Sequence, residues 1–185
     1  MTPDALQKID TSAIDALKSA LTGALLQPSD SDYNDARQIW NGMFDKKPAL
    51  IASCANTDDV ICAVNFAREH NLLTAIKSGG HNSAGSGSCD GGLMIDMSNM
   101  NVVTVDEGAR RARIEGGAIW EDFDRETQKH GLSAPGGLIS ATGVAGLSLT
   151  GGLGWLRGKF GLCIDNLVSV DIVTADGTLH TANGS

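Results

Sequence analysis

The chain has 185 residues and a formal net charge of −8 at neutral pH. This length predicts one domain with an ordinary hydrophobic core. The acidic balance, without any stripe of Lys and Arg, argues against a nucleic-acid partner. The apolar runs are too short and too rich in glycine to span a bilayer, so no membrane partner is expected.

The N-terminus and the cysteines bear on the cellular compartment. Asp4, Asp10 and Asp15 interrupt the region where a secretory signal needs an apolar run, so a cytoplasmic location is expected. The cysteines are spaced as neither a CxxC metal site nor a disulfide framework requires, so we expect free thiols and no bound metal. These cysteines are Cys54, Cys62, Cys89 and Cys163.

The first quarter of the chain predicts a helical leader. Residues 12–22 begin with Ser12 as a capping residue and carry an amphipathic pattern that Gly23 ends. Residues 28–35 are polar and predict a loop. We therefore expect residues 1–45 to form an N-terminal helical leader.

A β-α-β unit is predicted next. Residues 48–54 form an apolar run of strand length. Thr57 can cap a helix that ends near Asn71, because the apolar residues after it recur at helical spacing. Residues 73–77 then predict a second strand. A crossover of this kind delivers Ser78 to His81 at the C-terminal edge of the parallel strands.

The rest of the chain predicts hairpins and one more helix. Alternation and turn signals give strands at 93–97, 102–105 and 112–115, a helix at 119–130, a buried strand at 167–174 and a strand at 178–182. Asp176–Gly177 is a hairpin turn signal before the last strand. The expected fold class is α+β, with an N-terminal β-α-β unit followed by a mainly antiparallel sheet with helices.

Most of the 23 glycines lie in two windows, residues 79–92 and 131–161. In the first window Gly79 and Gly80 permit a tight turn whose N–H groups form a concavity suited to a phosphate. Short polar side chains beside the turn add hydrogen-bonding groups, and these are Ser78, Asn82, Ser83 and Ser88. The alternative interpretation is a flexible surface loop without a ligand.

The second window leaves room for a flat, extended ligand against bare backbone. Thr142, Ser148 and Thr150 could reach the polar atoms of such a ligand. The alternative is close packing of a Gly-rich turn against a helix. A Rossmann fingerprint does not fit, because the glycines from Gly152 to Gly158 have one residue too many between them and follow no clear strand.

Among the four histidines only His81 lies in a Gly-rich turn. His70 and His130 are expected to close helices, where a cationic side chain is favourable. His180 is expected on an exposed strand. No GxSxG elbow or hydrolytic triad pattern is present.

The ordered blocks IKSGGHNSAG, CDGGLMIDMSNM, RIEGGAIWEDF and HGLSAPGGLISATGVAGLSLTGGLGW are recognisable together. They resemble the PCMH-type FAD-binding domain of the vanillyl-alcohol-oxidase flavoproteins, and most closely the berberine-bridge-enzyme-like and hydroxynicotine-oxidase-like oxidoreductases. The resemblance runs from about Pro48 to the end. It implies that residues 46–185 form a FAD-binding domain of two α+β subdomains, incomplete at its C-terminus and without the substrate domain.

The resemblance also implies a cofactor site. FAD would lie between the two subdomains, and His81 would bond covalently to the 8α-methyl carbon of the flavin. Some relatives add a cysteine tether, but Ile139 stands at that position here, which predicts a single tether. The implied FAD contacts are Ser78, Gly79, Gly80, His81, Asn82, Ser83, Ser88, Pro135, Gly136, Thr142, Gly143, Gly146, Ser148 and Gly152.

The activity implied by the resemblance is oxidation of a small organic substrate, by hydride transfer to FAD, with oxygen as the acceptor. The general base is expected in the missing C-terminal part, so no catalytic residue is assigned. Two alternatives stay open. One is a dehydrogenase that holds FAD noncovalently, and the other is a truncated FAD-binding fragment without catalytic activity. The substrate and the oligomeric state are not predicted.

Overall fold

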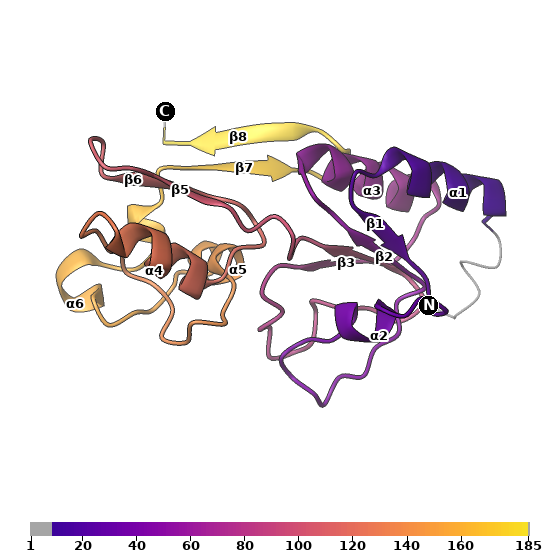
Figure 1. Cartoon of the computed structure of the whole chain (residues 1–185), viewed down its shortest axis with the longest axis horizontal. Helices are drawn as coiled ribbons and strands as arrows, with labels where there is room; N and C mark the ends of the chain where they lie inside the picture. The colour runs from indigo at the N-terminus through magenta and orange to yellow at the C-terminus, as the bar shows by residue number, and fades with distance from the viewer. Residues whose placement is uncertain (1–8, 185) are drawn as a thin grey trace.

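Two halves of the chain lie side by side, and a β-hairpin runs across both of them (Figure 1). The computed structural model describes residues 9–184, so Asp4 lies outside the described residues. The first half contains α1 (Thr11–Ala20), β1 (Ala24–Leu26), α2 (Tyr33–Ala36), β2 (Leu50–Ser53), α3 (Thr57–Glu69), β3 (Thr74–Lys77) and β4 (Leu93–Asp96). The second contains β5 (Val103–Asp106), β6 (Arg111–Ile114), α4 (Trp120–Gln128), α5 (Val144–Leu149), α6 (Arg157–Phe160) and a 3-10 helix (Ile164–Asn166), and the hairpin is β7 (Ser169–Val173) with β8 (Leu179–Asn183).

The first half is built on a four-stranded sheet in the order β1-β2-β4-β3. The predicted β-α-β unit is confirmed, with β4 inserted between its two strands and parallel to both. β1, which the sequence analysis did not predict, pairs antiparallel with β2. The mixed sheet and the helices agree with the predicted α+β class.

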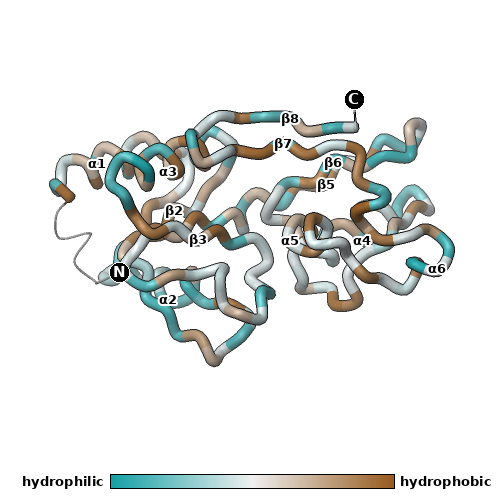
Figure 2. Tube along the Cα trace, turned by 180° about the vertical axis from the view of Figure 1, so that it is seen from behind, coloured by the Kyte–Doolittle hydropathy of each residue, from teal (hydrophilic) through white to brown (hydrophobic). Residues whose placement is uncertain are grey.

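Side chains alternate between the two faces of this sheet, as extended strands require. Leu50 and Ala52 of β2 pack with α1 and α3 in one hydrophobic cluster. Ile51, between them, packs on the other face against Tyr33 of α2. Figure 2 shows the hydrophobic stretches of β2 and β3 lying between the helices. Both faces of the central strands are therefore covered.

Helix starts differ from the predicted ones. Asp10 caps α1, because its carboxylate accepts the Ser12 N–H at 3.1 Å. Asn56 caps α3 by accepting the Asp59 N–H at 2.9 Å, and Thr57 is the first helical residue. In both cases the residue one or two positions earlier has the extended backbone that lets its side chain reach the free N–H groups.

The predicted loop at residues 28–35 contains the start of the short helix α2. Tyr33 is buried, and its hydroxyl donates to the Pro48 carbonyl at 2.7 Å. This tertiary contact holds a turn of helix that the polar sequence alone does not favour. The division at residue 45 stays a prediction. In the structure α1 packs against the sheet and β1 is one of its strands.

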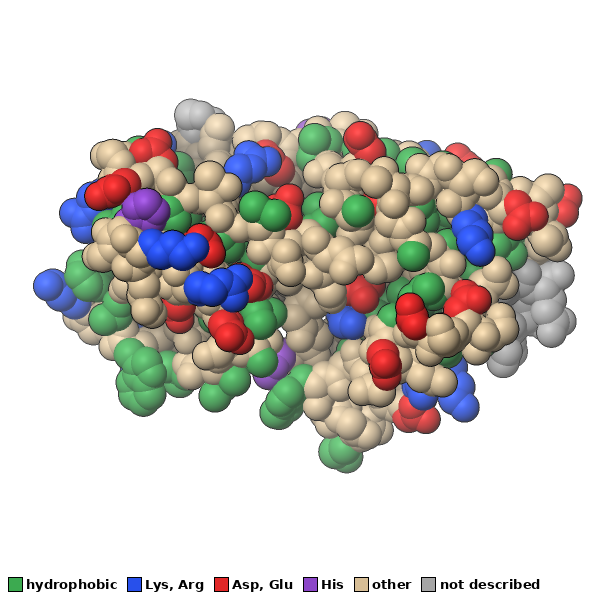
Figure 3. Space-filling model, in the orientation of Figure 1, with side chains coloured by type: hydrophobic (Ala, Val, Ile, Leu, Met, Phe, Trp, Pro, Cys, Tyr) green, Lys and Arg blue, Asp and Glu red, His purple; other side chains and the backbone are tan. Residues whose placement is uncertain are grey.

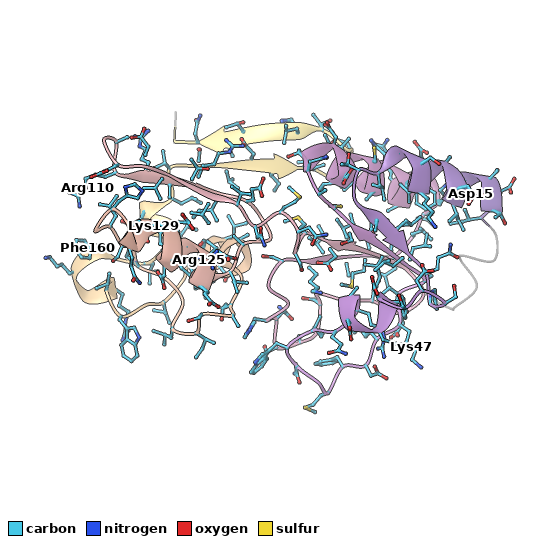
Figure 4. All side chains as sticks on the ribbon, in the orientation of Figure 1. Asp15, Lys47, Arg110, Arg125, Lys129 and Phe160 are labelled. Carbon is cyan, nitrogen blue, oxygen red and sulfur yellow. The ribbon has the colours of Figure 1, made fainter. Side chains whose placement is uncertain are left out.

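The second half has its own core around Trp120, Phe123 and Val144. The β5-β6 hairpin covers α4 on one side. Arg125 lies on the exposed side of α4 (Figure 4), and its guanidinium pairs with Asp122 at 2.8 Å.

The hairpin of β7 and β8 is where the predicted turn at Asp176–Gly177 lies, which confirms that turn. The strand predicted at 167–174 is present as β7, but the prediction that it is buried was wrong, because Ile172 is 44% exposed. Within the described residues no strand or helix covers the outer face of this hairpin. Its turn contacts α3 through a hydrogen bond from Arg68 to the Asp176 carbonyl, and Asp171 pairs with Arg113 of β6 at 2.9 Å.

In residues 9–184 no helix is long and apolar enough to cross a membrane. In the same range no three His, Cys, Asp or Glu side chains come together as a metal site. All four cysteines are free thiols, as predicted.

Candidate cofactor site

The parallel strands β3 and β4 end at the same edge of the sheet, where Lys77 and Asp96 are register partners. The Lys77 ammonium lies 3.3 Å from an Asp96 carboxylate oxygen and donates to the Ala36 carbonyl at 2.7 Å. The other Asp96 oxygen accepts from the Ser98 hydroxyl at 2.6 Å. In sheets of this kind, ligands bind beyond the carboxyl ends of the strands.

The two glycine windows meet at this edge. A Cβ added to Gly79 would come within 2.6 Å of the Gly143 Cα, and one added to Gly143 would come within 2.7 Å of the Ser78 hydroxyl oxygen. Thr142 is held here because its carbonyl accepts the Trp120 N–H at 3.0 Å. Only glycine allows backbone this close, which explains both positions. The structure thus brings together Ser78, Gly79, Thr142 and Gly143.

A pocket of about 270 Å³ opens beside this contact. Figure 3 shows the surface hollowed between the two halves. The pocket is lined by Lys77, Ser78, Gly79, Ser98, Asn101, Gly117, Ile119 and Asp122. The Ser78 hydroxyl is buried and has no hydrogen-bond partner within the chain. Buried hydroxyls almost always have a partner, so this one suits a polar ligand.

His81 follows the turn made by Gly80, whose φ of +68° lies in the left-handed region that favours glycine. The imidazole of His81 is half-buried and stacks on the Trp40 ring, with centroids 5.2 Å apart and planes 20° apart. The sequence predicted His81 in this turn, but no sequence pattern indicated a role for Trp40.

The later residues of the first window fold onto the loop that follows α2. The Asn82 side chain accepts from the N–H groups of Ala84 and Ser86, so it braces its own turn. Ser83 is exposed, and its carbonyl accepts from Asn41 at 2.8 Å. Ser88 is 2% exposed and its hydroxyl has no partner, so it lies beneath the loop and away from the pocket lining.

The residues of the second window that were predicted as cofactor contacts lie in different surroundings. Pro135 is buried, and a Cβ on Gly136 would collide with the Trp120 ring. The Ser148 hydroxyl is already bonded to the Val144 carbonyl at 2.7 Å. Gly152 has a φ of +76° and backs onto Cys163. At these positions the chain packs closely against itself, as the alternative interpretation of the second window predicts.

Gly146 differs from these residues, because no atom lies within 4 Å of a Cβ added there. It is on α5, on the exposed side. Of the four glycines in the second window that were predicted as cofactor contacts (Gly136, Gly143, Gly146 and Gly152), Gly146 alone faces open space.

The charged edge of the site was not predicted from the sequence. Lys77 and Asp96 are the last residues of two strands that the sequence did predict, so the shared edge of parallel strands was an available signal. Asn101, in the connection between the halves, and Asp122, on α4 of the second half, also line the pocket. Their positions depend on how the halves meet, for which the sequence carried no signal.

Comparison with known proteins gives a consistent result. The model of the family described as FAD binding domain matches residues 48–183. (R)-6-hydroxynicotine oxidase of Paenarthrobacter nicotinovorans is 39% identical over 158 residues, which are 85% of this chain and 34% of that protein. The chain therefore spans about a third of the length of this curated relative.

Solved structures agree with this match. The crystal structure of 6-hydroxy-D-nicotine oxidase from Arthrobacter nicotinovorans has a TM-score of 0.86 and 37% identity, and the match covers 88% of this chain and 36% of that chain. Carbohydrate oxidase from Microdochium nivale has a TM-score of 0.85 and 30% identity, over 92% of this chain and 37% of that chain. From its sequence, its fold and these matches, the chain belongs to the FAD binding domain family of FAD-linked oxidoreductases.

Proposed function

We propose that this chain is the FAD-binding portion of an oxidoreductase that oxidises a small organic substrate. The observation that carries the proposal is the contact of the two glycine windows at Gly79 and Gly143, beside the pocket. The family match supports FAD as the ligand of this site. The boundary at residues 46–185 and the cytoplasmic location belong to the same proposal.

The residues at this contact fit a dinucleotide. The buried Ser78 hydroxyl has a free hydrogen-bonding capacity, and the backbone from Gly79 to Asn82 offers N–H groups to a pyrophosphate. Gly146 leaves open space for a flat group against the backbone. The remaining contacts proposed from the sequence are Gly80, Ser83, Ser88, Pro135, Gly136, Thr142, Gly143, Ser148 and Gly152. When bound, FAD supplies the hydride acceptor, at flavin N5.

We also propose that His81 anchors the flavin covalently. One C–N bond forms between an imidazole nitrogen and the 8α carbon, while one C–H and one N–H bond break. Molecular oxygen would take up the two electrons and two protons released, and would become hydrogen peroxide. What this chain contributes is a held imidazole, at the end of a turn that Gly80 makes possible.

Oxygen is the proposed acceptor in turnover, because the similar (R)-6-hydroxynicotine oxidase and carbohydrate oxidase are oxidases. This point is tested by measuring oxygen uptake while the full-length protein oxidises a substrate. Reduction of a dye without oxygen uptake would identify a dehydrogenase.

The covalent anchor is tested by denaturing gel electrophoresis under ultraviolet light. We expect the 185-residue chain to give a fluorescent band, and intact mass to rise by one FAD. His81→Ala should lose the band, and His180→Ala, changed on an exposed strand, should keep it. A yellow native protein whose flavin is released by acid would show noncovalent FAD. A colourless chain would contradict FAD binding by this portion.

A further inference from the structure

Residues 39–41, here named the clamp segment, hold the turn that carries His81. The segment comes from the loop after α2, far from the turn in sequence. The Trp40 N–H donates to the Gly80 carbonyl at 3.1 Å. The Asn41 side chain donates to the Ser83 carbonyl at 2.8 Å. These two hydrogen bonds lie on either side of His81, so the backbone of the turn is held at both ends.

The Trp40 ring provides a third contact, on the imidazole itself. The two rings stack at 5.2 Å between centroids and 20° between planes. The Trp40 side chain is 65% exposed. Because so much of this ring stays in solvent, its burial contributes little to the fold, and the stack on His81 is its main aromatic contact. A flat ring on one face of an imidazole restricts rotation about both side-chain torsions of the histidine.

The family match begins at residue 48, so the clamp segment lies outside it. A Cβ at Gly80 would meet Ile39 at 3.6 Å, an ordinary contact distance, so the clamp segment also follows the turn closely. The three contacts make residues 39–41 a support built around one side chain.

We infer that Trp40 is a positioning residue for the covalent attachment of FAD to His81, an inference that rests on the proposed anchor. The stack holds the imidazole in the orientation from which its nitrogen reaches the 8α carbon. The bond formed is the C–N bond described above, with its two electrons and two protons passed to oxygen. Trp40 does not itself take part in that bond.

The test follows attachment in the 185-residue chain, produced without a flavin supply and then mixed with FAD in air. Samples are precipitated with acid at intervals, and the flavin that stays with the protein is measured. Trp40→Ala and Trp40→Leu should slow attachment by roughly tenfold to a hundredfold, the cost of a slightly misplaced reacting group. Trp40→Phe, which keeps an aromatic face, should restore most of the rate.

The matched control is Met43→Ala on the same loop, where the side chain is 87% exposed. We expect this variant to attach FAD at the unchanged rate. Noncovalent FAD affinity, measured by flavin fluorescence quenching before attachment, should be similar in all variants. Thermal unfolding of each apo chain shows whether a variant has lost its fold or only the position of His81. Comparing Trp40→Phe with Trp40→Leu shows whether an aromatic ring is needed at this position.

The outcomes separate the inference from the proposal beneath it. Unchanged attachment in Trp40→Ala, or equal attachment in the Leu and Phe variants, would overturn the role of the aromatic stack while leaving the His81 anchor intact. Failure of the unchanged chain to retain any flavin after acid would overturn the anchor and the inference together. Slow attachment in the Ala and Leu variants with recovery in the Phe variant supports both.

Discussion

Lys77 and Asp96 stand opposite each other at the ends of two parallel strands and form an ion pair, 3.3 Å long, whose side chains are 13% and 6% exposed. Removing one partner of a buried pair leaves the other charge uncompensated. We expect Lys77→Met to lower the free energy of unfolding by about 3 kcal/mol. Urea unfolding of the apo chain measures this, and a change below about 1 kcal/mol, as found for exposed pairs, would contradict it.

The contacts of Asp59 predict that acid weakens the packing of the N-terminal segment on α3. Its carboxylate accepts N–H bonds from Thr22, Gly23 and Ala55, at 2.8, 2.9 and 2.8 Å. Burial raises the pKa of Asp59, but these backbone bonds outweigh it and the net pKa is lowered. Because the folded pKa lies below the unfolded one, the stabilisation is present above the ordinary Asp range and is lost as pH falls through the folded pKa.

Asp59→Asn should therefore cost about 2 kcal/mol at neutral pH and flatten the acid limb of the stability curve. The control is Asp58→Asn, the exposed neighbour on the same helix, with an expected loss of about 0.5 kcal/mol from the helix dipole. Unfolding by urea at several pH values gives both results. Equal losses in the two variants would show that the three N–H bonds are not the cause.

Alanine should change apo stability in opposite directions at Gly146 and Gly79. Gly146→Ala adds a methyl group into open space on a helix, so apo stability should rise by about 0.5–1 kcal/mol. The same methyl group should weaken FAD binding if the cofactor lies there. Gly79→Ala would force its Cβ into Gly143, so we expect loss of both stability and FAD binding. Melting temperature and flavin fluorescence titration distinguish the two variants.

Thiol labelling should divide the cysteines into two pairs. Burial, aided by the charges of Asp59 and Asp96, raises the pKa of Cys54 to about 12. Burial also raises the pKa of Cys89. Since the thiolate is the reactive form, iodoacetamide at pH 8 should modify only Cys62 and Cys163 in the native chain. Peptide mass spectrometry reads the sites, and full labelling in urea is the control.

Local sequence patterns predicted those elements of the fold that depend on residues close together in the chain. The β-α-β unit from residue 50 to residue 77 and the hairpin turn at Asp176–Gly177 carry periodicity or turn residues of their own. β1 is three residues long, too short to show alternation. The insertion of β4 between β2 and β3 depends on long-range pairing, which no local pattern records.

The candidate site was likewise predicted only in those parts that a local sequence pattern records. Glycine spacing indicated that both windows approach something closely, and each is now seen to approach the other at Gly79 and Gly143. The exposure of β7 escaped prediction, because an apolar run does not reveal whether anything covers it. Trp40 escaped for a different reason. A single aromatic residue in a loop carries no periodicity, and its contact with His81 joins positions 41 residues apart in the chain.

β1 has a practical consequence for anyone who shortens this chain. The family match starts at residue 48, yet the outermost strand of the sheet is made by residues 24–26. A protein cut at residue 46 would leave the backbone groups of Ile51, Ala52 and Ser53 without their β1 partners. An uncapped, apolar edge of this kind recruits other chains, so such a truncation invites aggregation even though every glycine of the cofactor site is retained.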